Sequence, residues 1–258
     1  MPIIGAQTYT VREYTQDEDG FAKSMDRLSR IGFKHVQLSK IADMPAAKVR
    51  QICDGSGLGI VLTHTDPKKI LEQTEMVIEE HICLGAKYIG IGVMPAHYKE
   101  NFDGVKRFIS DYQPIAEEIH AAGLKLMYHN HMEEFAKFEG KLVMDHFAEA
   151  FDKEILGFTL DTAWVQAGGG DTAWWLRRLS GRLDTIHFKD MVYTLQGEMR
   201  TAEVMEGNLN WESIFEVCKD PATGIKYAFI EQDHCYGKDP FDSLEISLEN
   251  LINAGFSA

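Results

Sequence analysis

Residues 157–190 read GFTLDTAWVQAGGGDTAWWLRRLSGRLDTIHFKD and contain one complete strand–helix–strand unit. The two short apolar runs at 157–161 and 184–189 are typical of buried β-strands, and the segment between them is helical in character. A strand, a helix and a second strand in this order predict two parallel strands joined by a right-handed crossover. The unit therefore indicates an α/β protein.

The rest of the chain repeats this alternation. Short apolar runs separated by amphipathic segments predict strands at 3–9, 34–38, 59–63, 88–93, 124–130, 157–161, 184–189 and 227–232, with helices at 17–30, 67–84, 105–122 and 241–252. Eight such units in about 250 residues are the usual content of a closed barrel. We therefore expect a single (β/α)8 TIM-barrel domain over residues 1–258. A doubly wound open sheet is the competing fold, but no glycine-rich nucleotide loop follows the first strand.

The charge balance excludes several classes of partner. Lys and Arg total 26 against 40 Asp and Glu, which gives a formal net charge of −14. Such a surface repels nucleic acid, and no Lys/Arg cluster compensates for it. No apolar run reaches the roughly 18–20 residues of a membrane span, and the first residues do not resemble a signal peptide. The 4 cysteines are scattered without a CxxC pair, so we expect a cytoplasmic protein without disulfides.

The predicted strands end in imidazole and carboxylate side chains. In a barrel of this kind the chemistry gathers at the carboxyl ends of the strands. Polar residues stand there after most strands: Gln7, His64, His129, His131, Glu134, Asp161, Trp164, His187, Lys189, Glu231 and Asp233. One such ending is unremarkable, because loops are polar, but four consecutive units that mix imidazole with carboxylate indicate a site.

This mixture of donors is typical of a metal site. Asp161, His187 and Glu231 each end a different strand, and closure of the barrel brings strand ends together around one axis. Imidazole and carboxylate suit Mn²⁺, Zn²⁺, Co²⁺ or Fe²⁺, and Mg²⁺ is also considered. The fifth strand offers a fourth ligand, either His129 or Glu134.

Each of these residues also has an ordinary structural interpretation. Asp161 alone is most often a helix cap, and Glu231 alone could pair with Lys189. His64 either contacts substrate or makes a structural hydrogen bond, and Trp164 either stacks on a sugar or packs in the barrel. Trp174, Trp175 and Trp211 fall in or near helices and are expected in the core.

Several motifs together resemble the xylose-isomerase-like superfamily of sugar phosphate isomerases and epimerases, including its inosose dehydratase-like members. They are GAQTYTVR at 5–12, YHNHMEEF at 128–135, LDTAWVQAGGGD at 160–171, IHFKD at 186–190, EGNLNW at 206–211 and FIEQD at 229–233. The resemblance implies a metal held by Glu, Asp, His and Glu from strands five to eight. The last three correspond to Asp161, His187 and Glu231, whereas His129 stands in place of the first Glu. Trp164 stands where many epimerases of the superfamily have His.

The resemblance and the residues together predict a metal-dependent isomerase or epimerase of a small sugar, phosphorylated or not, or of a polyol. A base removes the proton next to a carbonyl, and the metal stabilises the resulting enediolate. Glu231, Glu134 and His131 are the candidate bases, and Lys189 supplies positive charge to a developing oxyanion.

Further contacts and two other functions remain open. Gln7, His64, Trp164 and Glu206 are candidate substrate contacts, and the loop after the seventh strand that contains Glu206 is expected to help close the site. A dehydratase acting on a keto-sugar or inosose-like polyol is the first alternative, and a non-catalytic sugar-binding barrel is the second. Many barrels of this kind form homo-oligomers.

Overall fold

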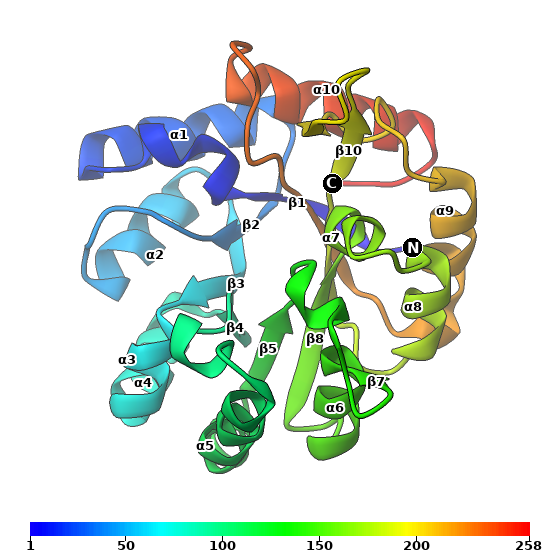
Figure 1. Cartoon of the computed structure of the whole chain (residues 1–258). Coiled ribbons are helices and arrows are strands. Elements are labelled where there is room, and N and C mark those ends of the chain that lie inside the picture. The colour runs from blue at the N-terminus through cyan, green and yellow to red at the C-terminus, as the bar shows by residue number, and fades with distance from the viewer.

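Eight parallel strands close into a barrel in a computed structural model that describes residues 1–258. The order around the barrel is β1-β12-β9-β8-β5-β4-β3-β2, and the helices form a ring outside it (Figure 1). The barrel strands are β1 (Ile3–Gln7), β2 (His35–Leu38), β3 (Gly59–Thr65), β4 (Tyr88–Ile91), β5 (Lys125–His129), β8 (Leu156–Asp161), β9 (Thr185–Phe188) and β12 (Tyr227–Ile230). The expected (β/α)8 barrel is confirmed.

The outer ring contains ten α-helices. They are α1 (Glu18–Ile31), α2 (Ala46–Gly55), α3 (Pro67–Glu72), α4 (Thr74–Leu84), α5 (Phe102–Ala121), α6 (Val143–Ala150), α7 (Thr162–Ala167), α8 (Thr172–Arg178), α9 (Trp211–Lys219) and α10 (Pro240–Asn253). The helix expected at 67–84 is divided at Gln73, whose φ of −140° breaks the helical path. None of these helices is both long enough and apolar enough to span a membrane.

Alternation along each strand decides which side chains enter the barrel. Odd-numbered residues of β8, Gly157, Thr159 and Asp161, face inward, and the Thr159 hydroxyl hydrogen-bonds that of Thr185, its partner on the adjacent strand β9, at 2.7 Å. The intervening Phe158 and Leu160 are fully buried in the large apolar core between the strands and the helices. Because side chains alternate with a period of two, a strand that buries its even residues against helices points its last odd residue into the barrel mouth.

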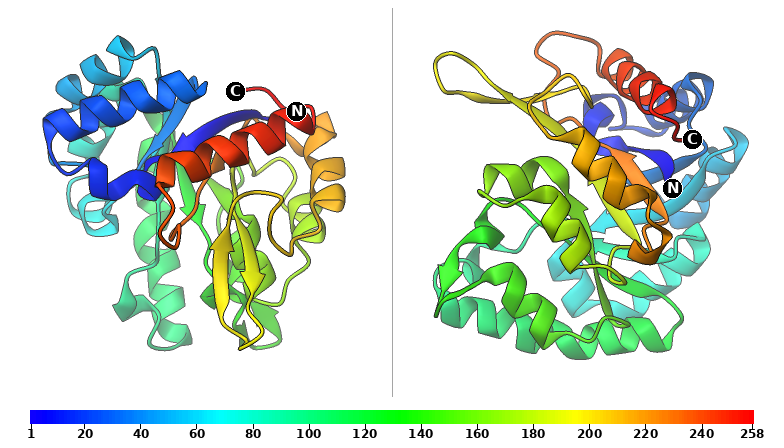
Figure 2. Two further views of the ribbon diagram at one scale, coloured as in Figure 1. Left: turned by 90° about the horizontal axis from the view of Figure 1, so that it is seen from above. Right: turned by 90° about the vertical axis from the view of Figure 1, so that its right-hand side faces the viewer.

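The loops contain two short hairpins and four 3-10 helices. The hairpins are β6 (Lys137–Phe138) with β7 (Lys141–Leu142) and β10 (Asp190–Tyr193) with β11 (Met199–Ala202), and the 3-10 helices are Thr8–Tyr14, Ala96–Tyr98, Glu133–Phe135 and Pro221–Thr223. The β10–β11 hairpin projects from the body of the barrel, and the two termini lie side by side (Figure 2). A parallel bridge between Ile3 and Ser257 joins these termini.

The tryptophans correct one sequence-based expectation. Trp175 and Trp211 are buried as expected, but the side chain of Trp174 is exposed, with 51% of the residue accessible. Adjacent residues on an α-helix point about 100° apart, so α8 turns only Trp175 toward the core. Trp174 instead lies near the guanidinium of Arg178, which is 5.3 Å from its ring centroid.

An ion-pair group of half-buried Asp184 and Lys125 with exposed Lys226 lies at the opposite, amino-terminal end of the barrel. Asp184 accepts a hydrogen bond from Lys125 Nζ at 2.9 Å and another from Lys226. Burial alone would raise the pKa of Asp184, but the hydrogen bonds and charges of these two lysines outweigh it and hold the pKa below its ordinary value. The ionised form therefore stabilises the folded state.

We expect Asp184→Asn to lower the free energy of unfolding by about 1–3 kcal/mol at neutral pH. Because the folded pKa is depressed, the wild-type advantage is complete above the unfolded value of about 4 and disappears as pH falls through the folded pKa. Urea denaturation of both proteins between neutral and acidic pH measures it. A stability difference that stays constant down to the acid transition would contradict this account.

Candidate metal centre and substrate cavity

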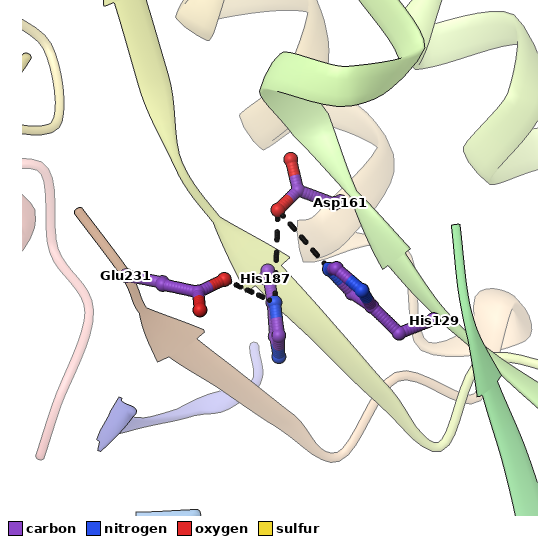
Figure 3. A group of neighbouring side chains, drawn as sticks. All are labelled: His129, Asp161, His187 and Glu231. Carbon is purple, nitrogen blue, oxygen red and sulfur yellow. Dashed lines mark hydrogen bonds and ion pairs between the residues drawn. The ribbon is translucent and has the colours of Figure 1, made fainter. Parts of the chain in front are cut away.

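Four side chains converge at the carboxyl ends of four neighbouring strands. His129 ends β5, Asp161 ends β8, His187 lies in β9, and Glu231 directly follows β12. All four are buried, and one potential ligand atom from each lies within 4.8 Å of the others (Figure 3). A cation with bonds of about 2.1 Å requires donor atoms up to about 4.2 Å apart, so only a small inward movement is needed. The structure thus brings Asp161, His187 and Glu231 together and places His129, not Glu134, as the fourth member of the cluster.

The hydrogen bond of His129 fixes which of its ring nitrogens faces the cluster. Its Nδ1 lies 3.0 Å from the backbone oxygen of Gly92, which can only accept, so Nδ1 carries the proton. The Nε2 lone pair then faces Asp161 Oδ2 at 3.3 Å. Either a proton on Nε2 or a cation bound between the two atoms satisfies both of them at this distance.

His187 is oriented in the same way by a residue from the opposite side of the barrel. Its Nε2 donates to Gln37 Oε1 at 2.8 Å, which leaves the Nδ1 lone pair facing Glu231 Oε2 at 2.9 Å. Both of these facing atoms are buried without a hydrogen-bond partner. Burial lowers the pKa of His187, but Glu231 and Asp161 outweigh it and raise the pKa above its ordinary value. The pocket thus attracts positive charge to this nitrogen.

The charges around the cluster match a divalent cation. Lys189 Nζ contacts Asp161 Oδ2 at 3.2 Å, Glu231 Oε2 at 2.9 Å and Asp233 Oδ2 at 3.2 Å. Burial would raise the pKa of Asp161 and Glu231, yet Lys189 and the neighbouring histidines hold both pKa values well below the ordinary range. Three carboxylates against one ammonium leave two negative charges. The donor set of two imidazoles and two carboxylates fits Mn²⁺, Fe²⁺, Co²⁺ or Zn²⁺ better than Mg²⁺.

Asp161 both caps a helix and faces the cluster, the two roles that its position in the sequence allows. Its Oδ1 accepts a hydrogen bond from the backbone nitrogen of Trp164 at 2.9 Å and so caps α7. Its Oδ2 faces the cluster. Asn130 Oδ1 accepts from the backbone nitrogen of Asp161 at 3.0 Å and fixes the strand end. The cap therefore orients the carboxylate instead of competing with metal binding.

A cavity of about 820 Å³ opens directly above the cluster. This volume falls within the range of small-molecule sites. Its lining includes the predicted residues His64, His131, Trp164 and Lys189, together with the candidate ligands His129 and Glu231. Gln7 is fully buried below His64 and approaches His64 Nδ1 with its Nε2 at 3.5 Å, so it supports His64 and does not line the cavity.

Glu134 and Glu206 do not line this cavity. Glu134 is buried, accepts from the hydroxyl of Tyr128 at 2.6 Å and accepts from the backbone nitrogen of His131 at 2.7 Å. Its oxygens therefore hold the loop that presents His131. Glu206 is exposed and accepts a hydrogen bond from Asn250 of α10 at 3.1 Å. The loop containing Glu206 is instead tied to the carboxylate of Asp190.

Three residues of the site have no assigned role in the sequence analysis. Gln37 orients His187, and its signal is a polar residue between the apolar Val36 and Leu38 of strand β2. Asp233 lines the cavity two residues after Glu231 and bonds Lys189 Nζ. Tyr236 also lines the cavity, but nothing in its sequence context distinguishes it from any exposed loop tyrosine.

The sequence model of the xylose isomerase-like TIM barrel family matches residues 25–233. The chain therefore belongs to this family. The matched segment contains all four members of the cluster. No protein of curated function matches the sequence.

Solved structures of the same architecture superpose over almost the whole chain. A sugar phosphate isomerase/epimerase from Parabacteroides distasonis has a TM-score of 0.83 at 22% identity, covering 100% of this chain and 96% of its own. A probable 3-DHS dehydratase from Bacillus anthracis has a TM-score of 0.73 at 14% identity, covering 98% of this chain and 99% of its own. A D-allulose 3-epimerase from Methylomonas sp. has 0.73 at 14%, covering 98% and 97%. At these identities the similarity establishes the fold alone.

The hydrogen bond from His187 to Gln37 leads to a prediction about metal affinity. We expect Gln37→Leu to weaken metal binding about 10–100-fold, because the imidazole loses the partner that fixes its tautomer and orientation. Gln37→Glu keeps an acceptor at this position and is the matched control, with affinity close to that of the wild type. Titration with Mn²⁺ or Zn²⁺ measures both. Equal affinities of Gln37→Leu and the wild type would exclude this orienting role.

Proposed function

We propose that the protein is a divalent-metal-dependent isomerase or epimerase that moves a proton next to the carbonyl of a small sugar or polyol. The observation that carries this proposal is the buried cluster of His129, Asp161, His187 and Glu231 at the floor of the cavity. These four residues would hold the metal, which as a Lewis acid polarises a carbonyl oxygen.

Two groups are placed to exchange protons with a molecule in the cavity. Asp233 lines it next to Glu231, and Lys189 Nζ contacts its carboxylate oxygens at 3.2 Å. His131 lines it from the loop after β5, three strands away around the barrel, with its Nδ1 buried and unpartnered. A carboxylate on one side takes the proton from carbon. On the other side burial lowers the pKa of His131 to about 3, so its neutral ring passes a proton from water to the substrate, taking one on one nitrogen as it gives one from the other.

Lys189 and Glu134 act on this arrangement from different positions. The Lys189 ammonium bridges three carboxylates and adds positive charge beside the reacting carbonyl, where negative charge develops. Glu134 fixes the backbone of His131 and so sets the position of its ring. Proton return to the same carbon from the opposite face gives epimerisation, and return to the neighbouring carbon gives isomerisation.

A dehydratase is the second candidate, and one feature favours it. The fourth member of the cluster is His129, so the two cavity carboxylates beside the cluster, Glu231 and Asp233, come from one strand end, whereas the third cavity carboxylate, Asp66, caps α3. Carboxylate base chemistry is then restricted to one side of the substrate. One base that removes a proton, with loss of a hydroxyl from the next carbon, is sufficient for dehydration.

Solvent deuterium exchange separates the candidates. We expect the metal-loaded protein in D2O to introduce deuterium next to the carbonyl of a keto-sugar without loss of water, as followed by NMR. Exchange accompanied by loss of water would select the dehydratase. The variant Asp233→Asn should lose exchange while retaining its metal content. Sugar binding that is unaffected by a chelator, without any exchange, would identify a non-catalytic binding barrel.

A further inference from the structure

The charge of the substrate can be inferred from the groups that surround the cavity. Proteins recognise phosphate and carboxylate through arginine or lysine side chains and through free amides at helix N-termini. No arginine is among the residues that line this cavity. Of its lysines, Lys189 is already bound to three carboxylates, and Lys40 is exposed at the rim.

Three helix N-termini around the mouth, those of α3, α7 and α10, are capped by the chain's own carboxylates. Asp66 accepts from the first turn of α3 at 2.9 Å, and Asp161 accepts from α7 at 2.9 Å. Asp239 accepts from the first turn of α10 at 2.9 Å. These carboxylates satisfy the amides that would bind an anion and repel a second negative charge.

The region after the seventh and eighth strands, where barrels of this kind often bind phosphate, is also closed to anions. The seventh barrel strand continues into the β10–β11 hairpin, and the carboxylate of Asp190 accepts from the backbone nitrogens of Met205 and Gly207 at 3.0 Å each. The eighth leads to Asp233, which lines the cavity, and then to the Asp-capped α10.

The cavity does offer partners for uncharged polar groups. His64 Nε2, His131 Nδ1 and Trp164 Nε1 are buried without hydrogen-bond partners, which suits them to hydroxyl groups. Trp164, Tyr9 and Tyr236 also line the cavity and provide aromatic faces for the C–H side of a sugar ring.

We infer that the substrate is an uncharged keto-sugar or cyclic polyol ketone and not a phosphate ester or a sugar acid. This inference rests on the proposed function, because it concerns the molecule on which the same site acts. Lys189 and a divalent cation would only balance the carboxylates of the cluster, so a phosphate dianion beside Asp233, Glu231 and Asp66 meets like charges and no cation that is free to pair with it. We therefore expect kcat/KM to favour a free ketose over its phosphate ester by about 100-fold or more.

The test compares matched pairs on the metal-loaded protein. D-Fructose, D-tagatose, D-ribulose and D-xylulose are each paired with their terminal phosphate ester, and scyllo-inosose and 2-keto-D-gluconate are added as neutral and anionic members. Deuterium exchange measures turnover, and the change in tryptophan fluorescence on titration measures binding, with Trp164→Phe to assign the signal. Higher kcat/KM or tighter binding for the esters than for the free sugars would overturn the inference.

The two readouts distinguish failure of this inference from failure of the proposed function. Absence of exchange with every compound contradicts the proposed proton transfer, and the fluorescence titration then still decides the charge preference. A variant that adds a positive charge to the cavity tests whether charge causes the preference for the free sugar. Val93 lines the cavity and is 44% exposed, so Val93→Arg should narrow the gap between ester and free sugar, whereas the neutral control Val93→Gln should not. Equal behaviour of the two variants would contradict the electrostatic origin.

Discussion

Replacing His187 by alanine is expected to remove metal binding and, with it, all measurable proton exchange. Loss of a residue that only orients a metal ligand costs about 10–100-fold in affinity, so loss of a ligand itself should cost more than 100-fold. The effect should be large because His187 lies centrally: its Nδ1 is 2.9 Å from Glu231 Oε2 and 3.6 Å from Asp161 Oδ2. Without the imidazole, the two carboxylates have only Lys189 between them.

Elemental analysis of the purified variant measures this loss directly, and a thermal shift provides a second readout that does not depend on activity. A metal that binds only the folded state raises its stability, by about 2.7 kcal/mol at a concentration of 100 Kd. Mn²⁺ or Zn²⁺ should therefore raise the Tm of the wild type but not that of His187→Ala. The control is His146→Ala, since His146 lies outside the cavity and contacts the backbone oxygen of Phe138. Full metal occupancy in His187→Ala would contradict the proposed centre.

The fold was predictable because one physical rule repeats along the chain. A barrel strand packs its outer residues against helices, so short apolar runs such as 157–161 stand out between amphipathic segments. All eight barrel strands lie where the sequence predicts them, but their ends differ from the predicted ends by one or two residues. The first strand ends at Gln7, because its side chain accepts from the backbone nitrogen of Tyr9 and starts a 3-10 turn. Side-chain hydrogen bonds of this kind are difficult to predict from local sequence.

The candidate site was predictable to the extent that strand ends determine it. Asp161, His187 and Glu231 meet because parallel strands of a closed barrel present their carboxyl ends to one axis. Loop residues follow no such rule. Glu134 and Glu206 were expected near the substrate, yet local hydrogen bonds hold Glu134 against Tyr128 and Glu206 against Asn250. Which way a loop carboxylate turns depends on partners that become neighbours only after folding.

Replacing Asp190 by alanine is expected to lower the free energy of unfolding by about 4 kcal/mol or more. Asp190 is fully buried and its carboxylate is the shared acceptor for five N–H groups. Oδ1 accepts from the backbone nitrogens of Met191 and Leu209, and Oδ2 accepts from those of Met205 and Gly207 and from the indole of Trp211. Truncation leaves these donors without a partner in a region that excludes water. Urea denaturation measures the loss.

The variant Asp190→Asn tests whether the acceptor capacity or merely the shape of this side chain matters. Either orientation of the amide turns its NH2 group toward at least two N–H donors. We therefore expect Asp190→Asn to lower the free energy of unfolding nearly as much as Asp190→Ala. The control is Asp54→Ala, which removes an exposed carboxylate paired with Arg50 at 2.7 Å and should cost less than about 1 kcal/mol. Near-wild-type stability of Asp190→Asn would contradict this role. Since the anchored segment follows the hairpin that carries Met199 and Thr201 into the cavity wall, loss of the anchor should also weaken substrate binding.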